Sequence, residues 1–273
     1  MVPVGRLAVI LAALCGAAVC AGAGDARQSA VDARLTSVAL GGRMHALVIL
    51  PSGYATSHRR FPVVYFLHGL PVGSNAYKAN AWLTALAAEA GSFILVEPQG
   101  ARDDDRDAEY LDWGPGRDWS TFVTRELTRY VDAHFRTIKA RSGRAIVGAS
   151  AGGYGAAMLG LNNLDEFSVI ESWSGYFHAT DPKGRSSIAA PASANVLTLV
   201  PRLRRAGPTF IGFYVGRSDP IFVPENRRFD RELTGAGVTH TFAVYPGGHT
   251  AGLWADHAVA WLRLATAHLA KPS

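Results

Sequence analysis

Short apolar runs alternate with stretches of helical periodicity from about residue 60 to the end of the chain. The apolar runs are rich in Val, Ile, Phe and Tyr and are bounded by Gly or Pro, which is typical of buried parallel strands. They cover residues 63–67, 93–97, 145–147, 169–173, 210–215 and 241–245. The alternation predicts the α/β class, with a mostly parallel sheet and helices on both of its faces.

Helical periodicity predicts the elements between these strands. The helices are expected over residues 81–90, 119–135, from 151 onward, 223–235 and 254–269. Ahead of them, residues 35–39 and 45–50 flank Gly41-Gly42 and predict an antiparallel hairpin that opens the sheet. Residues 183–194, rich in Ser, Ala, Gly and Pro, predict a flexible excursion within one domain. We expect that single domain to span residues 30–273.

The first 23 residues predict a signal peptide. Residues 1–6 carry one positive charge, residues 7–19 are almost wholly apolar, and Ala21-Gly22-Ala23 supplies the small residues that a signal peptidase needs. A membrane anchor, which needs about 20 apolar residues, is one alternative, and lipid attachment at Cys20 is another. Cleavage after Ala23 removes Cys15 and Cys20 and leaves no thiol. We therefore expect a secreted or cell-envelope protein.

The positive charge of the chain is dispersed. The formal net charge is +5, and removal of Arg6 with the signal leaves +4. Basic residues occur in pairs such as Arg59-Arg60 and Arg204-Arg205, whereas a nucleic-acid-binding face needs clustered charge. No later segment is long and apolar enough to span a bilayer. We expect a soluble mature protein that binds no nucleic acid.

One serine lies between glycines where a predicted strand gives way to a predicted helix. Gly148-Ala149-Ser150-Ala151-Gly152 fits the G-x-S-x-G pattern of a nucleophile elbow, in which small residues allow a sharp turn that exposes the serine hydroxyl. The alternative is that Ser150 is a small residue at which a strand and a helix pack. The surrounding sequence has to separate these interpretations.

A nucleophilic serine needs a general base and an acid that orients the base. The predicted strand 210–215 runs into a loop with Asp219, and the predicted strand 241–245 runs into a loop with His249. Because the carboxyl ends of parallel strands meet at one edge of a sheet, both side chains are expected beside Ser150. The alternatives are that Asp219 starts a turn and that His249 is a surface histidine.

Acyl transfer also needs two backbone N–H groups that stabilise the developing oxyanion. One is expected from Ala151, which follows the candidate nucleophile at the start of its helix. The other is expected from Leu70, in the loop after the strand 63–67. His68 in the same loop is expected to be structural, because the base follows the serine in the chain order serine, acid, histidine.

Asp103, Asp104, Asp105, Asp107 and Glu109 form an acidic run. Calcium prefers several carboxylates, but the spacing lacks the glycine turn and the terminal glutamate of an EF-hand loop. The sequence therefore predicts a solvated acidic loop and no metal site.

The neighbouring stretch Tyr110-Leu111-Asp112-Trp113-Gly114 precedes the second predicted helix. Trp113 is a substrate-binding candidate that walls the acyl or alcohol pocket. Packing in the core is the alternative, since sequence does not separate exposed from core tryptophans.

The chain resembles the esterase-D-like branch of the α/β-hydrolases, which includes S-formylglutathione hydrolases, feruloyl and acetylxylan esterases, and secreted mycolyltransferases. The resemblance lies in LHGL at 67–70, in residues 118–135, in GASAGGYGA at 148–156, in SWSGYF at 172–177 and in GGHTAGLW at 247–254. It implies the α/β-hydrolase fold, a Ser-Asp-His triad and no cofactor.

Two departures from the mycolyltransferases bear on function. Those enzymes typically carry Asp-Gly-Leu-Arg at the oxyanion loop, where this chain has His68-Gly69-Leu70-Pro71. Their tryptophan pair after the catalytic histidine is reduced to Trp254, which stays a substrate-binding candidate. We therefore expect a secreted serine esterase that hydrolyses a carboxylic ester. The alternatives are acyl transfer to a sugar or lipid hydroxyl, and a non-catalytic adhesion or carbohydrate-binding protein.

Overall fold

The computed structural model describes residues 28–70, 73–105, 109–179 and 191–273. The expected signal segment 1–23, with Cys15 and Cys20, lies outside the described residues, and so does most of the expected excursion 183–194.

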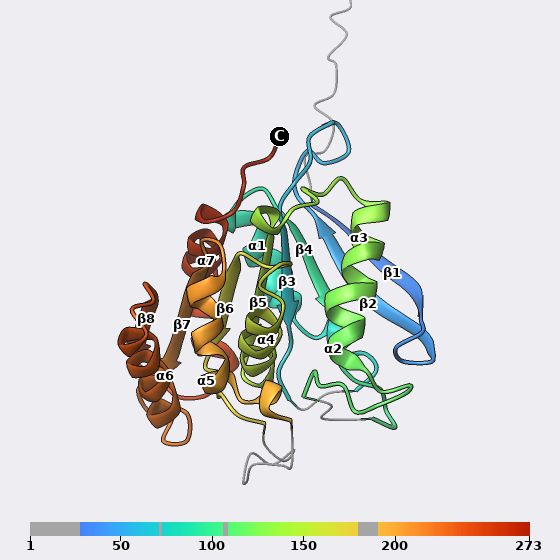
Figure 1. Cartoon of the computed structure of the whole chain (residues 1–273). Helices are drawn as coiled ribbons and strands as arrows, with labels where there is room; N and C mark the ends of the chain where they lie inside the picture. The colour runs from blue at the N-terminus through green and yellow to red at the C-terminus, as the bar shows by residue number, and fades with distance from the viewer. Residues whose placement is uncertain (1–27, 71–72, 106–108, 180–190) are drawn as a thin grey trace, which may run out of the picture.

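An eight-stranded sheet with the order β1-β2-β4-β3-β5-β6-β7-β8 forms the centre of the molecule (Figure 1). The strands are β1 (Ser29–Ser37), β2 (Gly42–Leu50), β3 (Val63–Leu67), β4 (Ile94–Pro98), β5 (Arg144–Ala149), β6 (Val169–Trp173), β7 (Phe210–Gly216) and β8 (Thr241–Tyr245). β1 and β2 pair antiparallel, as do β2 and β4, and every pair from β4 to β8 is parallel. The predicted parallel sheet and its opening hairpin are confirmed.

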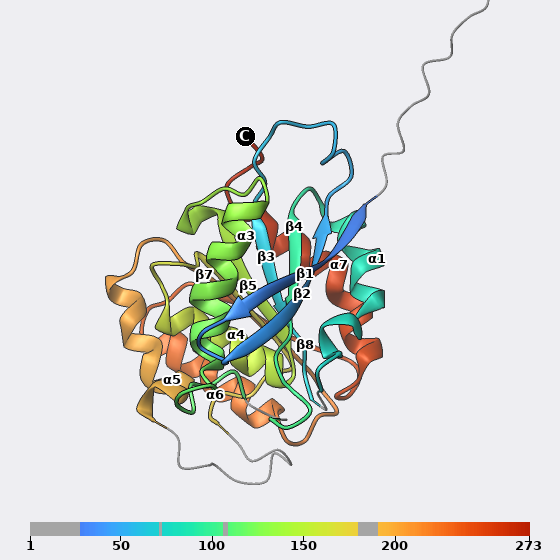
Figure 2. The ribbon, with the colours of Figure 1, turned by 90° about the vertical axis from the view of Figure 1, so that its right-hand side faces the viewer.

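Helices cover both faces of this sheet, and Figure 2 shows the layers from the side. The helices are α1 (Ala81–Ala90), α2 (Trp119–Thr121), α3 (Thr128–His134), α4 (Ala151–Asn162), α5 (Val196–Leu199), α6 (Val223–Gly235) and α7 (Ala251–Ala267). α1 and α7 pack together on one face, and the other helices lie on the opposite face. Each face therefore buries its own apolar cluster against the strands.

Three helical segments differ from the prediction. The expected helix 119–135 contains a π-helical segment, Phe122–Leu127, between α2 and α3. α7 begins three residues early, because the Thr250 hydroxyl accepts the N–H of Leu253 and caps the helix start at 3.3 Å. α5 was not predicted, since four residues are too few to show a helical period.

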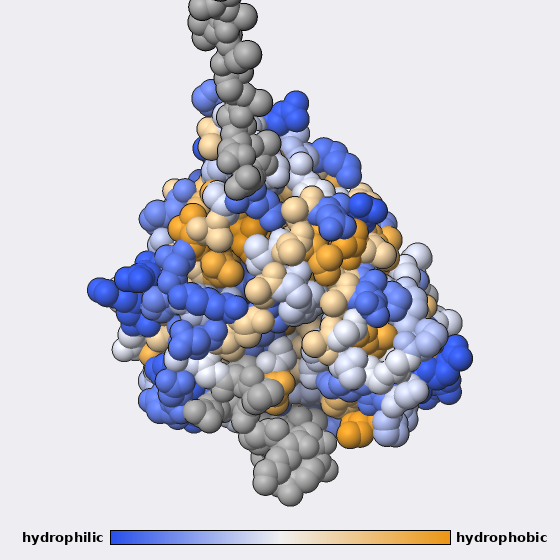
Figure 3. Space-filling model, turned by 180° about the vertical axis from the view of Figure 1, so that it is seen from behind, coloured by the Kyte–Doolittle hydropathy of each residue, from blue (hydrophilic) through white to orange (hydrophobic). Residues whose placement is uncertain are grey.

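Among the described residues, no helix is both long enough and apolar enough to cross a bilayer. On the face that Figure 3 shows, hydrophobic surface occurs in separate areas divided by hydrophilic residues.

Candidate active site

Ser150 occupies a sharp turn between β5 and α4. Its backbone has φ 57° and ψ −122°, a conformation that L-residues rarely adopt. The Ser150 N–H donates to the carbonyl oxygen of Trp173 at 2.9 Å, which ties the turn to the end of β6. The packing around the turn holds its backbone in this unfavourable conformation, and such conformations concentrate at functional sites.

The glycines on either side of Ser150 are required by close packing. A Cβ atom at Gly148 would lie 2.2 Å from the carbonyl oxygen of Gly152, and one at Gly152 would lie 1.9 Å from that of Leu67. The two small residues thus let α4 start directly against β3 and β5. The local sequence fits the elbow geometry for this steric reason.

The structure brings the three predicted side chains together. The hydroxyl oxygen of Ser150 lies 2.8 Å from Nε2 of His249, and Nδ1 of His249 lies 2.8 Å from Oδ2 of Asp219. Ser150 is 8% exposed and Asp219 is 3% exposed, so water has little access to either end of this chain of contacts. Loops after β5, β7 and β8 supply the three residues, and all lie at the carboxyl edge of the sheet.

Asp219 is held as a carboxylate. Burial raises the pKa of this carboxyl group, but hydrogen bonds from His249 and from backbone N–H groups outweigh burial and hold the pKa below its usual value. The backbone donors are Ile221 and Phe222, whose N–H groups lie 3.1 and 3.0 Å from Oδ1. Because Oδ1 takes the backbone donors, Oδ2 is directed at the histidine ring.

Two aromatic side chains flank the His249 ring. Trp254, a predicted substrate-binding residue, packs edge-on against it with ring centroids 5.2 Å apart. Phe222 contacts it at 5.0 Å and was not predicted. Its position three residues after Asp219, at the end of the same loop, was the available signal. These rings limit the orientations open to the imidazole.

The loop after β3 lies directly against Ser150. A Cβ atom at Gly69 would lie 2.9 Å from the Cβ of Ser150 and 3.5 Å from its hydroxyl oxygen. The half-buried Leu70 follows, and Ala151 is the first residue of α4. The two predicted oxyanion donors therefore belong to segments on either side of the serine, and the first N–H groups of a helix have no partner within it.

His68 and Tyr110 hold the loop after β3 in place through hydrogen bonds. Nε2 of His68 accepts the N–H of Gly100 at 3.1 Å, so its ring carries the proton on Nδ1, 3.3 Å from the carbonyl oxygen of Gly69. The Tyr110 hydroxyl donates to the His68 carbonyl oxygen at 2.8 Å. Burial lowers the pKa of His68 to about 4, which keeps the ring neutral. His68 has the contacts of a structural residue.

The predicted solvated acidic loop is wrong at two positions. Asp105 is 4% exposed and accepts bonds from Arg117 and from the indole N–H of Trp119, at 2.6 and 2.7 Å. Glu109 is 3% exposed, and both its oxygens accept the Tyr176 hydroxyl. Sequence patterning treats a run of carboxylates as solvated because the arginine and aromatic donors that bury them lie elsewhere in the chain.

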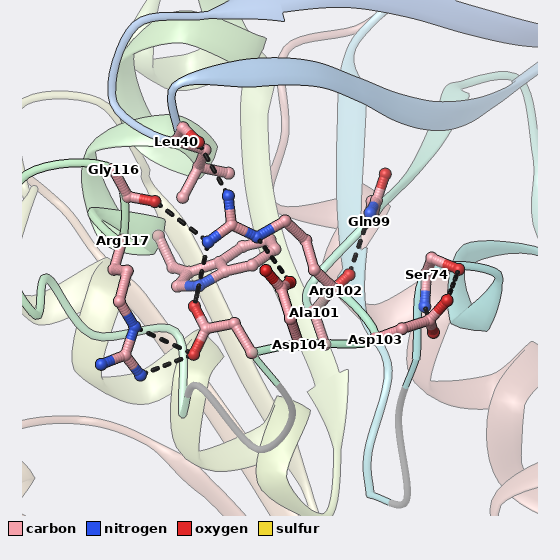
Figure 4. A network of polar contacts seen from close by, with 11 residues as sticks. Leu40, Ser74, Gln99, Ala101, Arg102, Asp103, Asp104, Gly116 and Arg117 are labelled. Carbon is pink, nitrogen blue, oxygen red and sulfur yellow. Dashed lines mark hydrogen bonds and ion pairs between the residues drawn. The ribbon is translucent and has the colours of Figure 1, made fainter.

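Figure 4 shows how this loop joins its neighbours. Arg102 donates to the carbonyl oxygens of Leu40 and Gly116, at 2.8 and 3.1 Å. The carboxylate of Asp103 accepts the backbone N–H and the hydroxyl of Ser74, beyond the candidate oxyanion loop. In the described part of the run, Asp103 and Asp104 are exposed, whereas Asp105 and Glu109 are buried. Among the described residues, no three His, Cys, Asp or Glu side chains are grouped so as to hold a metal ion.

Trp113 lies in the turn that precedes α2. It is 36% exposed, and its backbone N–H donates to the carbonyl oxygen of Arg117 at 3.1 Å. This exposure leaves its role as a wall of the substrate pocket a prediction.

The chain is similar to known esterases in sequence. Residues 37–263 match the Esterase family, described as "Putative esterase". Esterase Rv1288 of Mycobacterium tuberculosis (strain ATCC 25618 / H37Rv) is 27% identical over 249 residues, which cover 79% of this chain and 54% of that protein. The MPT51/MPB51 antigen of the same strain is 32% identical over 133 residues, 46% of this chain and 42% of the antigen. The chain spans about half the length of the curated relatives it matches.

Solved structures share the fold. A ferulic acid esterase superposes with a TM-score of 0.71 at 23% identity, covering 89% of this chain and all of that one. An S-formylglutathione hydrolase from Agrobacterium tumefaciens gives 0.72 at 19% identity, covering 89% of this chain and 95% of that one. At such identities the likeness concerns the fold alone. Together with the family match over most of the sequence, it shows that this chain belongs to the esterase family and has the α/β-hydrolase fold.

Proposed function

We propose that this protein is a serine esterase that hydrolyses a carboxylic ester through an acyl-enzyme on Ser150. The observation that carries the proposal is the continuous line of contacts from Asp219 through His249 to Ser150, with both distances at 2.8 Å. A serine hydroxyl is a poor nucleophile at its ordinary pKa, and a base at hydrogen-bond distance activates it.

Acylation begins when the hydroxyl oxygen of Ser150 attacks the ester carbonyl carbon while Nε2 of His249 takes the hydroxyl proton. His249 donates its Nδ1–H to the Asp219 carboxylate, which fixes the tautomer and stabilises the imidazolium that forms. The N–H groups of Leu70 and Ala151 stabilise the oxyanion of the tetrahedral intermediate, where each such donor contributes roughly 3 kcal/mol. When the intermediate collapses, the bond to the alcohol breaks and His249 returns the proton to the leaving oxygen.

Deacylation repeats these steps with water. His249 removes a proton from the water molecule, whose oxygen attacks the acyl carbon, and then gives that proton to the oxygen of Ser150 as the acid departs. An alcohol in place of water would give the acyltransferase alternative through the same acyl-enzyme.

We further propose that the enzyme works outside the cytoplasm, since residues 1–23 have the three-part pattern of a signal peptide.

The direct test is the initial rate on p-nitrophenyl acetate, butyrate and a long-chain ester, for the mature protein and for Ser150→Ala. We expect turnover by the wild type and a loss of at least about a thousandfold in the variant. Added glycerol or trehalose separates the two outcomes of the acyl-enzyme, because a transferase forms the new ester at the expense of free acid. Equal inertness of both proteins would contradict the proposal and favour a binding protein.

A further inference from the structure

A cavity of about 410 Å³ lies outside the line of Ser150, His249 and Asp219. It is bounded by the loop after β6, the start of α5 and the first two turns of α6. These segments contribute the apolar side chains of Phe177, Leu197 and Pro224 and the polar side chains of His178, Asn195, Glu225 and Arg228. Its volume is in the range of ligand-binding pockets, and its mixture of apolar walls and a few polar groups is typical of them.

Two aromatic residues connect the wall of this cavity to His249. Phe222 packs on the His249 ring at 5.0 Å and immediately precedes α6, and Pro224 in the cavity wall is two residues further on. Since an α-helix rises 1.5 Å per residue, the wall begins within one helical turn of the ring that touches His249. Tyr176 stacks on Phe222 and directly precedes Phe177, another wall residue. The wall of the cavity is therefore linked to His249 through Phe222 and Tyr176.

In the proposed reaction, the leaving alcohol lies beside His249. In the reaction proposed above, His249 gives its proton to the oxygen of the departing alcohol, so that oxygen has to be within hydrogen-bond reach of Nε2. The acyl group stays on Ser150. An inference about the alcohol therefore rests on the proposed esterase function.

Among the charged groups of the cavity, only two are paired in the described structure. Glu225, which also lines the cavity, contacts His178 at 2.8 Å and accepts the backbone N–H of Phe177 at 2.9 Å. Arg228 is exposed, one turn further along α6, and forms no ion pair or hydrogen bond with the described residues. The Oδ1 atom of Asn195 caps α5 by accepting the N–H of Leu197, which leaves its NH₂ group as a further donor.

We propose that the cavity binds the alcohol part of the ester and that this alcohol carries a carboxylate recognised by Arg228. A guanidinium group is weakly hydrated and matches the planar geometry of a carboxylate. The Asn195 amide supplies a second donor, and the walls formed by Phe177, Leu197 and Pro224 pack against the apolar body of the alcohol. Glu225 already has His178 and the Phe177 N–H as partners, so it repels an entering carboxylate less than a carboxylate without partners would.

The test compares matched esters that share one acetyl group. The charged substrates are 4-acetoxybenzoate and 3-(4-acetoxyphenyl)propionate, which place the carboxylate at two distances from the ester, and each is paired with its neutral primary amide. The kcat/KM ratio of acid to amide is measured for the wild type, Arg228→Gln and Arg228→Glu, after correction for uncatalysed hydrolysis. Arg227→Gln is the matched control, because Arg227 is an exposed neighbour on α6 that does not line the cavity.

We expect the wild type to prefer the acid for at least one of the two lengths. Arg228→Gln should lower that ratio about fivefold, the upper range for a partly exposed ion pair, and Arg228→Glu should lower it further. Arg227→Gln should leave the ratio at the wild-type value. The lost preference should shrink as salt concentration rises, because exposed charges are screened.

Two results would overturn the inference in distinguishable ways. If the neutral amides are hydrolysed with dependence on Ser150 but the ratio is the same in wild type and Arg228→Gln, the carboxylate assignment is wrong and the esterase function stands. If neither the four esters nor p-nitrophenyl acetate is hydrolysed, the proposed function fails and the inference fails with it.

Discussion

The two sides of Ser150 are held in different ways. On one side, His249 and Asp219 form a line of side-chain contacts whose members come from loops after β7 and β8. On the other side, the backbone at Gly69 and Leu70 is placed by buried groups that do not touch the serine, mainly His68 and Tyr110. Residues whose side chains would take part in the reaction and residues whose side chains position the backbone therefore differ in how readily a sequence reveals them.

The largest effect on activity is expected from a change in the line of contacts from Asp219 through His249 to Ser150. Asp219→Asn keeps the size of the side chain but offers His249 an amide, which disfavours the tautomer whose Nε2 accepts the Ser150 proton. We expect kcat to fall by a factor on the order of 10⁴ with little change in fold. The measurement is steady-state kinetics on p-nitrophenyl acetate, with circular dichroism as the check on folding.

Asp230→Asn is the matched control for that substitution. Asp230 contacts His240 at 2.9 Å, an aspartate–histidine pair that does not touch Ser150. Its variant should keep most of the activity. An equal loss in both variants would remove the distinction between the line at Ser150 and an ordinary surface pair.

Acidification should first reduce the contribution of His68 to stability, on the side of Ser150 where buried groups position the backbone. The folded pKa of His68 is lowered to about 4 from an ordinary value of 6.5, so between these pH values the unfolded chain binds a proton that the folded protein does not. Stability should therefore fall as the pH drops from 6.5 to 4, by about 3 kcal/mol from this residue. The lowered pKa of Asp219 acts later, since its contribution is lost only as the pH falls below 3.8.

Urea unfolding at a series of pH values measures this difference. His68→Gln lacks the titrating group, so its free energy of unfolding should change less steeply with pH between 6.5 and 4 than that of the wild type. Parallel curves for the two proteins would mean that His68 is protonated alike in the folded and unfolded states.

The smallest effect is expected from removal of the Tyr110 hydroxyl, which holds the loop after β3. Tyr110→Phe keeps the ring but removes the donor to the His68 carbonyl oxygen, which lets the following backbone shift. We expect kcat to fall about tenfold with KM nearly unchanged, because the proposed oxyanion donor, the Leu70 amide, would act mainly in the transition state. Tyr54→Phe, which removes a hydroxyl bonded to the Arg136 N–H far along the chain, should have no such effect. A change in KM alone would contradict a positioning role.

The sequence was sufficient to predict the strands, the hairpin and the three side chains that meet at Ser150. Each follows from a short-range pattern: apolar runs for the strands, Gly148 and Gly152 around the elbow, and strand-end loops for Asp219 and His249. These features are local, so neighbouring residues are enough to identify them.

The remaining features depend on contacts between distant segments. Tyr110 reaches His68 across 42 positions, and the buried carboxylate of Glu109 meets Tyr176 across 67. Asp105 is buried because Arg117 and the Trp119 indole satisfy it, which a reading of the acidic run as solvated could not anticipate. A charged group can be buried only where other groups pair with it. The sequence alone does not show which groups those are.

The central claim is that Ser150 is a nucleophile activated by His249, and covalent labelling tests it most directly. The mature protein is incubated with a p-nitrophenyl phosphonate, and its intact mass and the labelled peptide are determined by mass spectrometry. We expect one phosphonyl group per chain, located on Ser150, and none in Ser150→Ala. An unlabelled wild-type protein, or a label on another residue, would contradict it.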